Sequence, residues 1–108
     1  MNIEEILKTL ELPVGYFEYL GTKKEYIVYN EEMERPVNYS DNLPRNRIVY
    51  WQVHFFAPKN SDFRSRKKQI ENALKKAGFT VTDLVTLYEK ETKTIHIVIS
   101  CHAGEREE

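Results

Sequence analysis

The chain has 108 residues, of which 41% are hydrophobic and 31% are charged, and its formal net charge is −1. This length predicts one domain with a single core. The balanced charge argues against a surface that attracts nucleic acid or anionic lipid as a whole. No segment approaches the roughly 20 apolar residues of a membrane-spanning helix. The N-terminus lacks a basic region followed by an apolar one, so we expect no secretory signal and a protein made in a cytoplasm.

The first element is expected to be a short helix. Asn2 and Glu5 have the spacing of a capping box, and apolar residues then recur at helical intervals. Pro13 predicts the end of this helix, because proline cannot continue the hydrogen-bond ladder. The aromatic segment 13–21 is bracketed by glycines. It is consistent either with a short irregular strand or with an aromatic loop that packs across the sheet.

Residues 25–31 (EYIVYNE) predict a strand with two semi-apolar faces. Residues 32–46 follow, with Pro36, Pro44 and a Ser-Asp-Asn cluster, and they predict a long loop. Unstructured connections of about 15 residues are uncommon in compact domains and are usually functional or disordered. This segment is therefore a candidate binding element.

The strongest strand signal covers residues 47–57 (RIVYWQVHFFA), which are mostly β-branched, aromatic or histidine. Its odd positions form an unbroken apolar face, which we expect to line the core. Its even positions mix apolar and polar side chains, too apolar for open water and too polar for a dry core. A second layer or a partner chain could cover this face. The two sets are Val49, Trp51, Val53 and Phe55, and Ile48, Tyr50, Gln52, His54 and Phe56.

The C-terminal half predicts a helix over residues 61–77 that ends at Gly78, and then a hairpin of strands 80–89 and 94–101. In the hairpin, period-two alternation makes Val81, Val85 and Leu87 core candidates opposite three isoleucines. Six side chains are expected to be buried together: Trp51, Phe55, Ile70, Leu74, Val85 and Ile97.

These elements predict an α+β fold with two layers. We expect an antiparallel sheet of four to five strands, two helices on one face, and the order α-β-β-α-β-β. One domain spans residues 1–108, with the long loop at residues 32–46.

The residues that carry chemistry do not form a recognisable active site. The four glycines are scattered and do not form a phosphate-binding loop. His54 and His96 can lie mid-strand on comparable faces, but four ligands at zinc spacing are missing. Cys101 is expected to be a buried thiol. We therefore expect no catalytic residues, no metal and no cofactor, although a small enzyme with an unrecognised site remains a remote alternative.

A nucleic-acid-binding module is the main alternative function. The predicted helix at 61–77 is rich in lysine and arginine, and four of these side chains could contact phosphates. Asp62 and Glu71 interrupt the run, so a solvated helix face is the preferred explanation of this pattern. The seven tyrosines indicate either a protein interface or ordinary strand composition. The four candidate phosphate contacts are Arg64, Arg66, Lys67 and Lys68.

The order of several short landmarks resembles the small tail-completion proteins of long-tailed bacteriophages and prophages, also called tail terminators or tail-to-head joining proteins. These landmarks are residues 12–16 (LPVGY), 26–29 (YIVY), 39–42 (YSDN), 50–56 (YWQVHFF), 77–79 (AGF), 88–89 (YE) and 96–99 (HIVI).

The resemblance implies a non-enzymatic subunit that forms a ring, expected to hold six copies, at the head-proximal end of the tail. Its partners would be copies of itself, the tail-tube protein and the head connector or a head-completion protein, with no membrane and no specific nucleic acid. It would be a virion component assembled in the bacterial cytoplasm. The implied subunit and tail contacts are Met33, Arg35, Val37, Tyr39, Asp41, Tyr50, Gln52 and His54.

Overall fold

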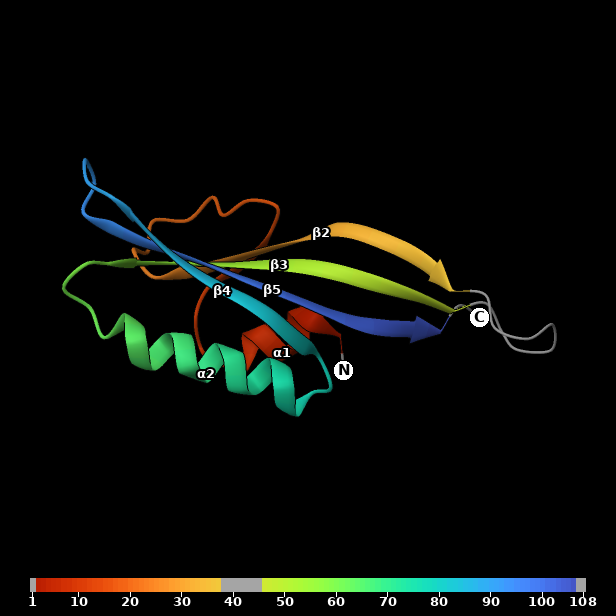
Figure 1. Cartoon of the computed structure of the whole chain (residues 1–108). Helices are drawn as coiled ribbons and strands as arrows, with labels where there is room; N and C mark the ends of the chain where they lie inside the picture. The colour runs from red at the N-terminus through yellow and green to blue at the C-terminus, as the bar shows by residue number, and fades with distance from the viewer. Residues whose placement is uncertain (1, 38–45, 107–108) are drawn as a thin grey trace.

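A computed structural model describes residues 2–37 and 46–106 and has an α+β fold, in which two helices pack on one face of a five-stranded sheet (Figure 1). The elements are α1 (Ile3–Lys8), β1 (Val14–Tyr16), β2 (Tyr26–Val37), β3 (Asn46–Pro58), α2 (Phe63–Lys76), β4 (Thr80–Glu89) and β5 (Thr94–Arg106). No helix in the described ranges is long and apolar enough to cross a lipid bilayer.

The sheet has the strand order β1-β2-β3-β5-β4 and is mixed, because β1 runs parallel to β2. The expected all-antiparallel sheet and the order α-β-β-α-β-β are therefore wrong in detail. Segment 13–21 does contain a strand, which the sequence left open. Residues 17–25 return the chain to the same end of the sheet, as a parallel pair requires. Phe17 N–H donates to the Tyr29 carbonyl at 2.9 Å, which holds the turn after β1.

The expected loop at residues 32–46 is wrong over its first part, because β2 continues to Val37 in register with β3. A β-bulge between Glu31 and Met33 shifts the register by one residue. Beyond the bulge β2 is an edge strand, where Pro36 is tolerated because no other described strand pairs with that side of β2. Residues 38–45, with Tyr39, lie outside the described residues.

The core lies between the sheet and the helices. The burial expected for Phe55 on β3, for two side chains of α2 and for one of β5 is confirmed, because each of the four is fully buried. Trp51 is only partly buried. Val85 and Leu87 are each 48% exposed, so their expected core positions are wrong. The buried core residues that were expected correctly are Phe55, Ile70, Leu74 and Ile97.

A second bulge explains the error at Val85. It lies between Val81 and Asp83, where one extra residue reverses the alternation of β4. Leu84 therefore pairs with Ile99 on the helix-covered face, whereas Val85 pairs with Val98 on the other face. Period-two counting through the bulge assigns every later side chain to the wrong face.

The start of α1 and the end of α2 follow their local sequence signals, whereas α1 ends at Lys8, before the expected stop at Pro13. The Asn2 side chain accepts a hydrogen bond from the Glu5 backbone N–H at 2.9 Å and caps α1. Gly78 follows α2 with φ of 99°, the left-handed conformation that glycine adopts most readily. Cys101 is buried, as expected, and burial raises the pKa of its thiol to about 12.

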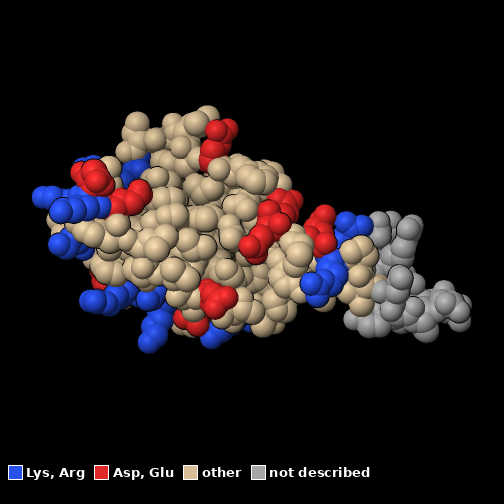
Figure 2. Space-filling view, turned by 45° about the horizontal axis from the view of Figure 1, so that its top comes forward, with Lys and Arg blue, Asp and Glu red and all other residues tan. Residues whose placement is uncertain are grey.

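Three strands extend beyond the helices and form an arm (Figure 1). We define the arm as residues 33–37 of β2, 46–50 of β3 and 102–106 of β5, which are paired in register. The described chain measures 53 × 24 × 22 Å, so the molecule is more than twice as long as it is wide. Figure 2 shows the body narrowing toward this end.

Candidate functional site

The sheet face opposite the helices is the main candidate for a binding surface. We call it the open face, because no described helix covers it (Figure 1). Strand register places side chains from four strands on it. They include Tyr26, Val28, Asn30, Met33, Arg35, Val37, Tyr50, Gln52, His54, Phe56, Val85, Leu87, His96, Val98 and His102.

A row of stacked rings crosses one half of the open face. The ring centroids of Tyr19 and Tyr26 are 4.4 Å apart, those of Tyr26 and Phe56 are 4.8 Å apart, and those of Phe56 and His96 are 4.2 Å apart. His54 completes the row, with its ring 5.1 Å from that of His96. The rings come from three neighbouring strands and the 17–25 segment, so they tie these elements together.

His54 and His96 interact directly, with 2.9 Å between His54 Nδ1 and His96 Nε2. One ring must donate and the other accept, so at least one imidazole is neutral. Burial lowers the pKa of both histidines, and His96 lowers that of His54 further, while Glu89 opposes the decrease at His96. Both rings are therefore neutral at pH 7, and the middle of the open face carries no charge from them.

Other side chains on the open face are apolar and exposed. Met33 is 44% exposed, and Val85 and Leu87 are each 48% exposed. Met33 lies on β2 beyond its bulge, whereas Val85 and Leu87 lie on β4, next to the strand that carries His96. An exposed apolar surface that joins aromatic, methionine and aliphatic side chains is typical of a protein interface.

The predicted interface residues from the two parts of the chain come together on this face. Met33 pairs with Tyr50, and the Arg35 guanidinium lies 5.8 Å from the centre of the Tyr50 ring. Val37 lies farther along the same face of β2, at the end of the arm. The sequence analysis placed these residues in two separate elements, a loop and a strand, whereas β2 and β3 pair along their length here.

Gln52 and His54 lie on the same face of β3. Gln52 Nε2 donates to Glu32 Oε2 at 3.3 Å, which links β3 to the bulge of β2. Tyr39 and Asp41, the other predicted contacts, lie outside the described residues. Val85, Leu87 and His102 were not predicted as interface residues. The bulge in β4 moves Val85 and Leu87 to the face opposite to the one that simple alternation predicts. If the predicted strand at 94–101 had been extended, its alternation would have placed His102 on the open face.

The four basic residues of α2 that were predicted to contact phosphates in the nucleic-acid alternative have different environments and do not form one uniform basic row. Arg66 Nη1 donates to the Leu10 carbonyl at 3.2 Å and to Gln69 Oε1 at 3.1 Å, so it joins α2 to the end of α1. The Arg64 guanidinium lies 5.4 Å from the centre of the Phe63 ring. Lys67 is partly buried, and Lys68 is exposed. Arg66 has a structural contact that phosphate binding would break.

The described part of the chain contains no assembled set of metal ligands. His54 and His96 are adjacent, but no group of three or more His, Cys, Asp or Glu side chains in residues 2–37 and 46–106 could hold a metal ion.

No protein-family model matches the chain, and no curated protein matches its sequence. Its function therefore has to be argued from the geometry of the open face and the arm.

Proposed function

We propose that the chain is a structural subunit that assembles with copies of itself into a ring at the head-proximal end of a bacteriophage tail and joins the tail to the head. The observation that carries the proposal is the open face, where apolar and aromatic side chains lie on a sheet face that neither described helix covers. Covering such a surface is favourable by about 25 cal/mol per Å² of apolar area removed from water. A neighbouring protein is the natural cover.

The chemistry of this face supports a protein partner. Interfaces are enriched in tyrosine, methionine and arginine. The open face carries these types in contact at Met33, Arg35 and Tyr50. The neutral pair His54 and His96 leaves the centre of the face without the charges whose burial would be costly.

The arm provides a second means of contact. β1 pairs only with Ile27–Tyr29, so the backbone edge of β2 beyond these residues has no neighbour among the described strands. An unpaired edge can accept a strand from another subunit. In the proposed assembly, the arm and the open face contact the next subunit, the tail-tube protein or the head connector. The subunit acts without a cofactor, as a virion component assembled in the bacterial cytoplasm.

The test replaces the exposed apolar side chains of the open face. A Met33→Ser, Val85→Ser, Leu87→Ser variant should melt within a few degrees of the parent, because these side chains are about half exposed. It should fail to complete tails in an in vitro head-to-tail joining assay that uses tails lacking this subunit. The matched control is Leu20→Ser, which removes an apolar side chain that is 85% exposed and belongs to the connection between β1 and β2, not to a strand of the open face.

The control should join heads to tails at the parent rate. The proposal would be wrong if the triple variant, folded like the parent, also joined them at the parent rate. In that case the open face would not be an assembly surface.

A further inference from the structure

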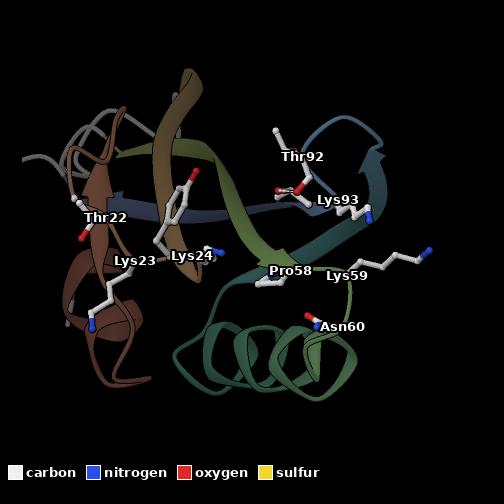
Figure 3. A pocket seen from close by; sticks show the side chains of 11 residues that line it. Thr22, Lys23, Lys24, Pro58, Lys59, Asn60, Thr92 and Lys93 are labelled. Carbon is white, nitrogen blue, oxygen red and sulfur yellow. Dashed lines mark hydrogen bonds between the residues drawn. The ribbon is translucent and has the colours of Figure 1, made fainter.

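Two pockets of opposite charge lie at different ends of the molecule. The first has a volume of about 790 Å³ and is lined by four lysines. We call it the basic pocket. Figure 3 shows it between the segment that carries Lys23 and Lys24 on one side and Lys59 and Lys93 on the other. None of its described lining residues is acidic.

The backbone holds the basic pocket in shape while its charges stay exposed. Lys59 N–H donates to the Lys93 carbonyl at 3.0 Å, and Lys23 N–H donates to the Tyr19 hydroxyl at 2.9 Å. All four lysine side chains are exposed, and within residues 2–37 and 46–106 none forms an ion pair. Like charges gathered around one concave surface attract an anionic partner.

The second pocket has a volume of about 410 Å³, and we call it the acidic pocket. It is lined by the carboxylates of Glu4, Glu31 and Glu105 together with aromatic rings, including that of Trp51. No described lysine or arginine lines it. Carboxylates beside aromatic rings bind lysine or arginine side chains, because charge attraction and the electron-rich ring faces act together.

Tyrosine hydroxyls orient two of these carboxylates. Tyr29 Oη donates to Glu4 Oε1 at 2.7 Å, and the Tyr16 hydroxyl donates to Glu31. The hydrogen bond from Tyr29, with help from Lys8, lowers the pKa of Glu4. The acidic pocket is therefore anionic at neutral pH, although Lys8 Nζ lies 3.5 Å from Glu4 Oε2 and shares part of that charge.

The length of β5 gives the distance between the two pockets. Thr94 at the start of β5 lines the basic pocket, and Glu105 near its end lines the acidic pocket. Eleven residues of strand at about 3.3 Å each separate them by roughly 36 Å. Figure 2 shows many blue side chains at the end away from the arm, with some red ones beside them, and both red and blue side chains where the body narrows toward the arm.

We propose that the two pockets are the two halves of a head-to-tail contact, in which the lysines around the basic pocket of one copy bind the acidic pocket of the next. This inference rests on the proposed function, since it names the contact that would build the ring. Two different patches joined in this way close into a ring when the rotation between copies allows it. A second copy is the occupant because it satisfies both pockets, whereas a phosphate ligand would satisfy only the basic one.

The experiment exchanges the charges. Variant A carries Lys24→Glu and Lys93→Glu, and variant B carries Glu31→Lys and Glu105→Lys. Each alone brings like charges together, so its dissociation constant for self-association should rise about tenfold or more relative to the parent at low salt. An equal mixture of A and B restores opposite charges at every contact and should assemble like the parent. Analytical ultracentrifugation measures all three samples.

Matched controls change the same number of charges elsewhere. Lys68→Glu with Lys76→Glu, and Glu11→Lys with Glu18→Lys, alter exposed residues that line neither pocket and should assemble like the parent. Circular dichroism of each variant shows that it is folded. The contact is wrong if A or B alone assembles like the parent, or if the folded mixture fails to assemble. It is also wrong if the parent stays monomeric at about 1 mM protein and low salt.

Two further results separate the alternatives. If A loses binding of tripolyphosphate while keeping self-association, the basic pocket belongs to a phosphate ligand and the contact is wrong. If the mixture of A and B assembles while parent and mixture both fail to join heads to tails, the contact stands and the proposed function fails. If A alone joins heads to tails at the parent rate, the contact fails and the proposed function stands.

Discussion

Neighbouring side chains on β3 serve different purposes. Phe55 is fully buried against the helices, whereas His54 beside it lies half-buried on the open face. Alternation along one strand therefore divides the residues that stabilise the fold from those available to a partner. Substitutions at adjacent positions should separate the two properties.

Phe55→Ala should lower the free energy of unfolding by about 3–5 kcal/mol, since it leaves a cavity in the centre of the core. Urea denaturation monitored by circular dichroism measures the change. Leu20→Ala is the control, because this side chain is 85% exposed and its loss should change stability by less than about 0.5 kcal/mol. Similar losses in the two variants would contradict the assigned core.

The histidine pair should make stability depend on pH. Burial lowers the folded-state pKa of both His54 and His96 below the ordinary value of 6.5, so the unfolded chain binds more protons near that pH. Their contribution is complete well above pH 6.5 and is lost as the pH falls through that value toward the lower folded-state pKa. A His54→Gln, His96→Gln variant should lose less stability than the parent between about pH 7.5 and about pH 5.5.

Thermal melts across this range measure the difference. Carboxylates contribute equally to the pH dependence of stability in parent and variant. The difference between the two curves therefore isolates the contribution of His54 and His96. Parallel curves would show that protonation of His54 and His96 is not coupled to folding.

The helices and strands differ in how far the sequence determined them. The long alternation at residues 47–57 and the capping of α1 by Asn2 are local signals, and the structure follows them. Placing His54 and His96 on comparable faces also needed only alternation, and they are in contact. Local signals of this kind survive folding because the tertiary contacts agree with them.

The errors have a different origin. Each of the two bulges adds one residue to a strand, and the extra residue has no local sequence signal here. The proline and glutamate content of residues 32–37 disfavours a strand, but pairing with β3 overrides that preference. The parallel pairing of β1 depends on a contact with β2 that propensity cannot report. For the same reasons, the parts of the open face formed by the end of β2 and by β4 could not be assigned in advance.

A substitution at Gly78 tests the backbone conformation that follows α2. Gly78→Ala should cost about 1 kcal/mol, because a side chain at φ of 99° is strained although no atom lies within 4 Å of the added carbon. Gly104→Ala is the matched control, since its φ is not in the left-handed region and its nearest contact is an ordinary 3.9 Å from the Arg47 carbonyl. Denaturant midpoints of the two variants give the comparison. Equal midpoints would mean that the backbone at Gly78 adopts another conformation.

The whole molecule combines an elongated sheet with helices on one face only. Its long dimension of 53 Å and its uncovered face give it surfaces that point in several directions. The proposed assembly requires such surfaces, because each subunit in it would contact two neighbours and two different partners at once. The same arrangement leaves an isolated copy with exposed apolar surface.

Charge placed on the open face should therefore reduce self-association without unfolding the chain. A Val85→Lys, Leu87→Lys variant should change the free energy of unfolding by less than about 1 kcal/mol, since both side chains are about half exposed. Sedimentation velocity should show a larger fraction of monomer than for the parent at equal concentration. Thr82→Lys, with Thr86→Lys on the helix-covered side of β4, is the control that adds the same charge. An unchanged monomer fraction would show that the open face does not take part in self-association.

Cys101 gives the protein an internal reporter. Its thiol is buried at the centre of β5, and burial raises its pKa to about 12, so almost no thiolate exists at pH 8 while the sheet is closed. A thiol reagent can react only when the strands around Cys101 open, and the labelling rate therefore measures how often they do. Because the sequence contains one cysteine, every label counts one such event. Under the proposed function, comparing the rate for free subunits with the rate for assembled particles would show how much rigidity each subunit acquires on assembly.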